Sequence, residues 1–344
     1  MKKRVTLADV AREAHVGIGT ASRVLNDMPD VSPEKRKLVL STMKKMNFKP
    51  NRIAQGLMSK PMKMLAVVVS DITSTFFSSI IKGIENNLPK EYGLMLFNTS
   101  LDTKRLHTAL EMIYEKHADG LFFLGEHMDE ITLNKLEQSH MPVVAVSSKI
   151  PFTNKKFPAN FAYVSINNEQ AAYLATDYLC ESGHRRIALL ISDIKDENVG
   201  FDRYNGYRRA LLDNKIKLDS EIIFEGDLSL LSGYELTQKM INQTRNNLPT
   251  AIFAASDNAA LGALRALHEN NLSVPEDISI IGFDGIESTE FSTPSLTTIS
   301  QPRLEMGEES VALMMKLISN DQLLERKMTL DFSFIKRESV QSKK

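Results

Sequence analysis

With 344 residues, 42% of them hydrophobic and 25% charged, the chain has the composition of a globular protein of two or three domains, which excludes disorder, collagen and a coiled-coil rod. The longest apolar run, residues 64–69, is far below the ~18 residues of a membrane span, and no apolar signal core follows the basic start, so we expect a cytoplasmic protein without a membrane partner. Residues 1–60 carry 13 Lys and Arg against 5 Asp and Glu, a net charge of +8, and the other 284 residues carry 29 against 38, or −9. A basic module on an acidic body indicates a polyanionic partner for the first 60 residues alone.

Three short helices are predicted at the start of the chain. Apolar residues spaced by three and four between residues 7 and 14 indicate an amphipathic helix with Thr6 as its N-cap. A break at residues 15–17 separates it from a second helix at about 18–26, and Ser32-Pro33-Glu34 opens a third. Two helices joined by a three-residue turn form a helix-turn-helix, whose second helix lies in the major groove of DNA.

The second helix is the segment that would read bases. Its exposed positions are expected at Ile18, Gly19, Ser22 and Arg23, of which Arg23 alone could make a bidentate contact with guanine. A helical pair with one arginine is also what a solvated helix in a small bundle would show. The local charge of +8 favours the DNA interpretation.

Beyond Pro61, short apolar runs alternate with amphipathic segments, and this alternation predicts βαβ units with parallel sheets. A first series of strands is expected at residues 64–70, 93–98, 120–124 and 142–146. A second series is expected at residues 162–166, 187–192, 222–225, 250–254 and 278–283. Helices are expected near residues 76–90, 103–117, 129–139, 168–181, 203–214, 232–243 and 258–270. The predicted fold class is α/β, with two doubly wound parallel-sheet subdomains after an all-α amino-terminal module.

Blocks along the whole chain follow one family pattern. They are VTLADVAREAHVGIGTASRVLN, VSPEKRKLVL and MNFKPNRIAQGLMSK, followed by GHRRIALL, PTAIFAASDNAALGALRAL, VPEDISIIGFDG and PSLTTISQPRLEMGEESVALMM. In this order they resemble the LacI/GalR family of bacterial transcription regulators.

The resemblance implies a division of the chain into three parts. A helix-turn-helix headpiece is expected at residues 1–50, a hinge helix and linker at 51–61, and an effector-binding and dimerisation core, like a periplasmic binding protein, at 62–344. Within the core, the N-subdomain is expected at about 62–160 plus 293–322, and the C-subdomain at about 161–292 plus 323–344.

The resemblance also implies a set of DNA contacts. They are Thr6, Gly17, Ile18, Gly19, Thr20, Ser22, Arg23, Asn26, Asn51, Ala54 and Leu57. The chain departs from the family at His15, where glycine is usual and a left-handed turn is needed, and at Gly17, where serine is a common N-cap. Ile18 and Gly19 are small and apolar, which suits contact with a thymine methyl group.

The predicted hinge helix is too short to be stable by itself. Eight residues cannot hold an isolated helix in water, and Gly56 lowers the propensity by a further ~1 kcal/mol. Physical chemistry alone therefore favours a linker with Leu57 packed on the core. The resemblance implies instead that two hinge helices, one per protomer, meet in the minor groove, where Leu57 is wedged into the central base step.

Polar residues follow the predicted strands, and open α/β sheets bind ligands outside the carboxyl ends of their strands. The resemblance implies six ligand contacts, which are Phe76, Phe77, Arg203, Asp257, Asn258 and Asp284. The two aromatics would stack on the ligand, the arginine would clamp it, and the other three would bind hydroxyl or amine groups, a set that suits a sugar. The alternatives are a core position for the aromatics, a helix N-cap for Asp257 and a turn position for Asp284.

Signatures of catalysis are weak. GIGTAS at residues 17–22 has two of the three glycines of a dinucleotide fingerprint but follows a helix, and GxxxxGK[ST], GxSxG and HExxH are absent. The seven histidines have no metal-ligand spacing, and Cys180 has the surroundings of a core residue. We expect no enzyme, no metal site and no cofactor.

The expected function is that of a regulator controlled by a ligand. A homodimeric repressor would bind a near-palindromic operator in double-stranded DNA, and a sugar or sugar phosphate between the core subdomains would switch it. The alternative is a carbon-catabolite-type regulator whose main control is docking of a phosphocarrier protein coeffector. DNA binding by the purified protein alone would separate the two. Residues 328–344 lack a leucine heptad, which favours a dimer over a tetramer.

Overall fold

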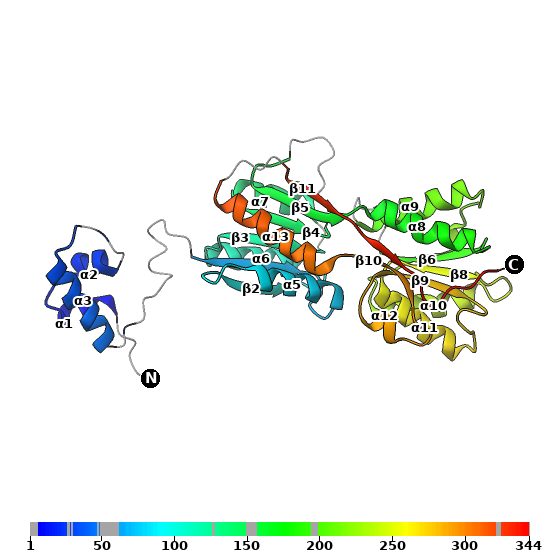
Figure 1. Cartoon of the computed structure of the whole chain (residues 1–344), viewed down its shortest axis with the longest axis horizontal. Helices are drawn as coiled ribbons and strands as arrows, with labels where there is room; N and C mark the ends of the chain where they lie inside the picture. The colour runs from blue at the N-terminus through cyan, green and yellow to red at the C-terminus, as the bar shows by residue number, and fades with distance from the viewer. Residues whose placement is uncertain are drawn as a thin grey trace. The chain divides into compact units, whose positions relative to one another are not determined.

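The computed structural model divides the chain into two compact units, Met1–Met62 and Lys63–Lys344. The residues it describes are 6–25, 28, 30–46, 48, 62–125, 128–148, 157–192, 194, 199–320 and 325–343. The first unit is the headpiece and the second is the core (Figure 1).

The headpiece is a bundle of three helices, α1 (Leu7–Glu13), α2 (Ile18–Leu25) and α3 (Pro33–Lys45). Thr6 caps α1, since its hydroxyl accepts a hydrogen bond from the Asp9 amide and the Asp9 carboxylate accepts one from the Thr6 amide. His15 adopts the expected left-handed conformation, with φ 51°, in the turn before α2. The three helices share one small apolar core.

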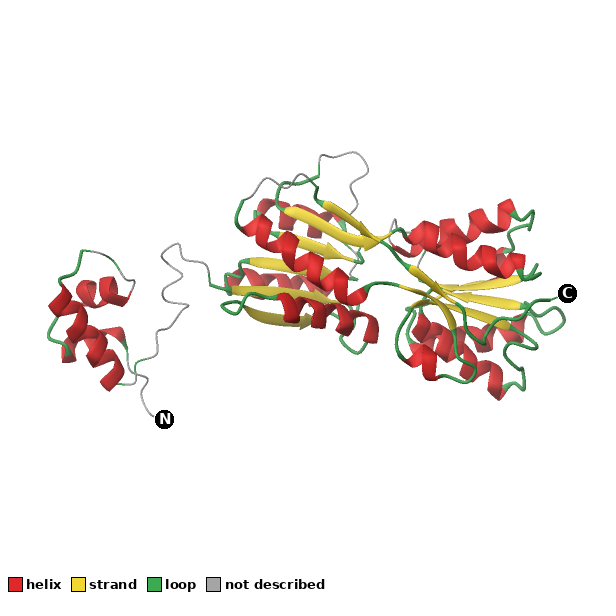
Figure 2. Cartoon of the chain, in the orientation of Figure 1, coloured by secondary structure: helices red, strands yellow, loops and turns green. Residues whose placement is uncertain are grey.

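The core contains two six-stranded sheets (Figure 2). The first, in the order β11-β5-β4-β3-β1-β2, is built from β1 (Met64–Val69), β2 (Gly93–Asn98), β3 (Gly120–Leu124), β4 (Val143–Val146), β5 (Phe161–Ile166) and β11 (Lys327–Leu330). The second, in the order β12-β10-β9-β8-β6-β7, is built from β6 (Ile187–Ile191), β7 (Ile223–Glu225), β8 (Ala251–Ala254), β9 (Ser279–Asp284), β10 (Thr297–Ser300) and β12 (Ser333–Ile335). Among the described strands, the pair of β10 and β12 is antiparallel and the other pairs are parallel.

Helices cover both faces of each sheet, which explains why the central strands are continuous apolar runs. The first sheet lies between α5 (Thr75–Asn87) with α13 (Arg303–Ile318) on one face and α6 (Thr103–Glu115) with α7 (Glu130–Gln138) on the other. The second lies between α8 (Asn168–Glu181) with α9 (Val199–Asp213) and α10 (Leu230–Gln243) with α11 (Asp257–Glu269). The short helices η1 (Ser220–Ile222) and α12 (Ser288–Phe291) complete the core. Within the described part of the chain, no helix is long and apolar enough to cross a membrane.

The chain passes between the two sheets three times, after β5, after β10 and between β11 and β12. These crossings correct the expected subdomain boundaries. Strand β5, expected to begin the second series, lies in the first sheet, and β10, expected in the N-subdomain, pairs with β9 in the second. Likewise β11, expected in the C-subdomain, pairs with β5. The boundaries near residues 160, 293 and 323 were wrong because a buried apolar strand looks the same in sequence whichever sheet it joins.

Candidate functional site

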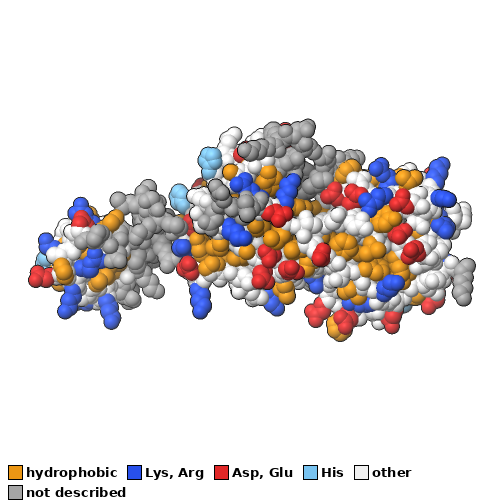
Figure 3. Space-filling view, turned by 45° about the horizontal axis from the view of Figure 1, so that its top comes forward, with side chains coloured by type: hydrophobic (Ala, Val, Ile, Leu, Met, Phe, Trp, Pro, Cys, Tyr) orange, Lys and Arg blue, Asp and Glu red, His pale blue; other side chains and the backbone are white. Residues whose placement is uncertain are grey.

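The headpiece presents the first residues of α2 to solvent. Ile18 is 57% exposed, and the space beside Gly17 and Gly19 is open, since a Cβ atom on either would meet nothing within 4 Å. Thr20 and Ser22 are half-buried, and the opposite face of the helix is held in the bundle by Ala21 and Val24. Figure 3 shows Lys and Arg side chains around the headpiece, as the charge count predicts.

Arg23, the predicted base-reading residue, is 60% exposed and forms an ion pair with Asp30, its Nε lying 3.4 Å from the Asp30 Oδ2. Exposed pairs of this kind contribute at most about 1 kcal/mol. The guanidinium can therefore leave Asp30 for a base at little cost. The predicted contacts Asn26, Asn51, Ala54 and Leu57 lie outside the described residues.

A cavity of about 410 Å³ lies between the two sheets of the core. On the side of the first sheet it is lined by Ser70, Asp71, Ser74, Phe76, Phe77, Ser100, Leu101, Gly125, Ser147 and Ser148. On the side of the second sheet it is lined by Ser192, Val199, Gly200, Arg203, Asp227, Leu228, Ser229, Ser256, Asn258 and Asp284. Most of these residues follow the carboxyl ends of parallel strands, which is where ligands of open α/β sheets bind.

Backbone conformations that non-glycine residues rarely adopt gather in this lining. Positive φ angles occur at Ser100 (54°), Leu101 (58°), Ser147 (50°), Leu228 (62°) and Asp284 (122°). Such conformations cost of order 1–3 kcal/mol each and persist where the surrounding structure enforces them, often at ligand sites.

The two aromatic residues expected to stack on a ligand lie at the start of α5. Their rings are in edge-to-face contact, with centroids 5.0 Å apart. Phe76 is also part of the apolar core, whereas Phe77 is half-buried and packs on Gly125. Gly125 has φ +65°, and a Cβ atom there would lie 2.0 Å from Cζ of Phe77. Glycine at position 125 therefore leaves the room in which the Phe77 ring sits.

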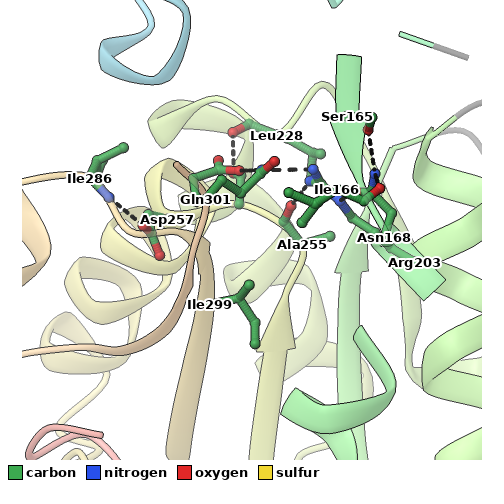
Figure 4. Close-up of polar contacts among 12 residues, drawn as sticks. Ser165, Ile166, Asn168, Arg203, Leu228, Ala255, Asp257, Ile286, Ile299 and Gln301 are labelled. Carbon is green, nitrogen blue, oxygen red and sulfur yellow. Dashed lines mark hydrogen bonds and ion pairs between the residues drawn. The ribbon is translucent and has the colours of Figure 1, made fainter. Parts of the chain in front are cut away.

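Arg203 is held from several directions, by residues of the second sheet and by Asn168 at the start of α8 (Figure 4). Its Nε donates to Oδ1 of Asn168 at 3.0 Å and its Nη1 to the carbonyl of Ala255 at 2.5 Å, while the guanidinium stacks on the Phe283 ring at 3.9 Å from the centroid. Its Nη2 lies 3.9 Å from Oδ1 of Asp284. Burial lowers the pKa of Arg203, and the nearby carboxylates oppose that shift.

Asp284 ends β9 with the strained φ of 122°. Its Oδ1 accepts a hydrogen bond of 2.8 Å from the side-chain amide of Gln301, and its carbonyl accepts one from the Gln301 amide. Burial raises the pKa of Asp284 to about 7, although Arg203 opposes the shift. Gln301 lies in the second crossing between the sheets, so this carboxylate links the cavity to a crossing segment.

Asp257 and Asn258 differ in where they lie. Asp257 is fully buried and does not line the cavity, because its Oδ1 accepts from the Thr298 hydroxyl at 2.6 Å and its Oδ2 from the Ile286 amide at 2.8 Å. Burial raises its pKa to about 6. The N-cap of α11 is Ser256, not Asp257. Of the two, Asn258 lines the cavity and Asp257 lies behind its surface.

Two residues of the site were not anticipated from the sequence. Asn168 and Gln301 hold Arg203 and Asp284, and both lie where the chain crosses between the sheets. Their partners come from distant parts of the chain, so no local signal marks them. Within the described residues, no group of three His, Cys, Asp or Glu could hold a metal ion.

A helix-turn-helix headpiece and a two-sheet core with a polar cavity between its sheets, in one chain, define the class of DNA-binding regulators that respond to a ligand. A model of bacterial regulatory proteins of the lacI family matches residues 6–51, and one of a periplasmic binding protein-like domain matches residues 176–340. Catabolite control protein A of Priestia megaterium is 34% identical over 319 residues, covering 92% of this chain and 93% of that protein. The chain belongs to the LacI family, and it is a DNA-binding transcription regulator with an effector-binding core.

Solved structures agree with this assignment along most of the chain. A lac repressor dimer bound to operator and the anti-inducer ONPF has a TM-score of 0.76 at 28% identity, covering 98% of this chain and 100% of that chain. A complex of the transcriptional regulator CelR with cellobiose has a TM-score of 0.72 at 29% identity, with the same coverage of both chains.

Proposed function

We propose that this regulator is a repressor whose operator binding is controlled by a sugar or sugar phosphate bound in the cavity of the core. The observation that carries the proposal is the position of the cavity. Its lining comes from both sheets, and the buried pair of Asp284 and Gln301 ties it to a crossing segment. A ligand that touches Phe77 on one side and Arg203 on the other bridges the subdomains and can change their relative orientation.

The chemistry of the lining supports a polyhydroxyl ligand. Aromatic rings offer a face for the apolar side of a sugar ring, and the amide, carboxylate and serine groups offer hydrogen bonds to its hydroxyls. The similar regulator CelR was solved with cellobiose, which is a sugar.

On the DNA side, we propose that α2 enters the major groove and that the chain acts as a homodimer on a near-palindromic site. The exposed start of α2 supports the first part, and the lac repressor structure, a dimer on its operator, supports the second. A hinge helix with Asn51, Ala54 and Leu57 would bind the minor groove, with Leu57 wedged between base pairs.

The test has two stages. Operator DNA is first selected from a random pool with the purified full-length chain. Tight binding without a second protein would also decide against the phosphocarrier alternative. Sugars and sugar phosphates are then screened by thermal shift, where a ligand at 100 times its dissociation constant should stabilise the core by ~2.7 kcal/mol. A hit that leaves operator affinity unchanged would contradict the proposal.

A further inference from the structure

The charged groups of the cavity bear on whether the effector is a neutral sugar or a sugar phosphate. Its described lining carries the carboxyl groups of Asp71, Asp227 and Asp284 and one cationic side chain, that of Arg203. We propose that the effector is a neutral sugar rather than a sugar phosphate, and that Asp71 and Asp227 reject anions while accepting sugar hydroxyls. This inference rests on the proposed function of the cavity as the effector site.

Arg203 cannot turn its whole guanidinium toward an anion. Its Nε and Nη1 already donate to Asn168 and Ala255, and its Nη2 faces Asp284. A phosphate that turned the guanidinium toward itself would leave the buried acceptors on Asn168 and Ala255 unpaired, which is costly in a buried site. The remaining N–H groups of Arg203 can donate to a hydroxyl or to a phosphate oxygen without any such movement, so the discrimination between the two rests on Asp71 and Asp227.

Asp71 and Asp227 face the cavity from opposite sheets, following β1 and β7. Oδ1 of Asp71 accepts from the amide and hydroxyl of Thr73, at 2.9 and 2.7 Å, and Oδ1 of Asp227 accepts from the Ser229 amide at 2.9 Å. Each carboxylate is thus fixed in its own turn by one oxygen, and within the described part of the chain its Oδ2 has no partner. Asp71 is half-buried and Asp227 is exposed, so solvent weakens the effect of the second charge more than that of the first. Both oxygens can accept from hydroxyl donors and both repel a phosphate, which at neutral pH is mainly an acceptor.

The uncharged groups of the lining favour hydroxyls as well. Ser70, Ser74, Ser147 and Ser192 contribute hydroxyls, and Asn258 contributes an amide, none with a hydrogen-bond partner among the described side chains and backbone groups. A serine hydroxyl both donates and accepts, so it complements a sugar hydroxyl, which does the same.

The amino-terminal end of α5 is the feature that could oppose this inference, because free backbone amides at a helix start can bind an anion. Ser74 caps this helix without a side-chain hydrogen bond. Asp71 belongs to the same turn, since its carbonyl accepts from the Ser74 amide at 3.3 Å. Its negative charge therefore lies beside the helix start and offsets the attraction for an anion.

The experiment uses the full-length chain and matched pairs of probes in calorimetry: glucose and glucose 6-phosphate, ribose and ribose 5-phosphate, and cellobiose and its 6-phosphate. For the pair that binds, we expect the neutral sugar to bind at least tenfold more tightly than its phosphate. The double variant Asp71→Asn with Asp227→Asn keeps the shape and the Oδ1 acceptors, and it should reduce that preference by tenfold or more. Melting curves establish that each variant is folded, and either single variant replaces the double one if it is not.

The control is the double variant Glu111→Gln with Glu308→Gln, which makes the same change in net charge at two exposed positions of α6 and α13 outside the cavity lining. It should keep the wild-type preference. A phosphorylated probe that binds wild-type protein as tightly as its neutral partner would overturn this inference and leave the proposed effector site standing. If no probe of either class binds, the proposed function fails and the inference fails with it.

Discussion

In the headpiece Ile18 and Arg23, two of the side chains expected to contact DNA, are exposed, whereas in the core Arg203 and Asp284 of the cavity are buried. Ile18 and Arg23 are 57% and 60% exposed, and Arg203 and Asp284 are 6% and 7% exposed. The headpiece is folded by a separate apolar core, to which neither Ile18 nor Arg23 belongs. In the core, Arg203 and Asp284 line the cavity and also form hydrogen bonds with Asn168 and Gln301 of the crossing segments. We therefore expect substitutions of exposed headpiece residues to change DNA affinity without changing stability. Substitutions of the buried cavity residues should change both effector affinity and the stability of the core.

Replacing Arg203 should have the largest effect. Arg203→Ala leaves the buried Asp284 carboxylate without its cation and removes the donors to Asn168 and Ala255, so we expect the core to lose about 3–5 kcal/mol of unfolding free energy. Effector affinity should fall tenfold or more. Urea unfolding and calorimetry measure the two quantities. The exposed Arg208→Ala in the same helix is the control and should change stability by no more than about 0.5 kcal/mol. Equal losses of unfolding free energy in the two variants would show that the buried contacts of Arg203 do not stabilise the core.

Arg23→Ala tests whether DNA binding and stability are independent in the headpiece. We expect a loss of ~1–3 kcal/mol on operator DNA, little change on random DNA, and an unfolding free energy within about 0.5 kcal/mol of wild type, because the Arg23 side chain is exposed. Fluorescence anisotropy on both DNAs measures the first two. If both DNAs lose affinity equally, Arg23 contacts phosphates rather than bases.

The buried carboxyl groups predict a pH dependence of core stability. Burial raises the pKa of Asp284 to about 7 and that of Asp257 to about 6, above their ordinary value of 3.8. In this pH range the folded core thus binds more protons than the unfolded chain. Its unfolding free energy should therefore fall as pH rises from 5 to 7. The fall is on the order of 1.4 kcal/mol for each unit of pKa shift that lies between these pH values. Asp284→Asn should make the fall shallower in urea titrations. Parallel curves for variant and wild type would refute this prediction.

The smallest effect is expected for Asp30→Asn. Removal of the exposed ion pair with Arg23 should change headpiece stability by less than about 1 kcal/mol, because such pairs are well solvated. Loss of a negative charge beside the expected DNA surface should raise affinity for operator and random DNA alike, and more at low salt. A large loss of stability would show that the headpiece also depends on its exposed charges.

Much of the fold follows from local patterns. The apolar runs predicted β2 and β3 to the residue, and the cap at Thr6 and the proline at Pro33 predicted the starts of α1 and α3. The site was predicted in outline because parallel strands end at one edge of a sheet, so residues after strands meet there. The finer arrangement depends on long-range pairing. The sheet that β5 joins and the inward turn of Asp257 toward Thr298 are set by contacts that no local window contains.

The three crossings between the sheets also constrain how the core can be made. Strands β11 and β12 are the last two strands among the described residues, and each forms an edge of a different sheet, β11 beside β5 and β12 beside β10. During synthesis, the first sheet cannot be completed until α13 covers one of its faces and β11 pairs with its edge strand β5. Both elements are synthesised long after the first strands of that sheet. Neither subdomain is a continuous segment, so neither can be completed before residues near the end of the core have been synthesised, and the two must finish folding together.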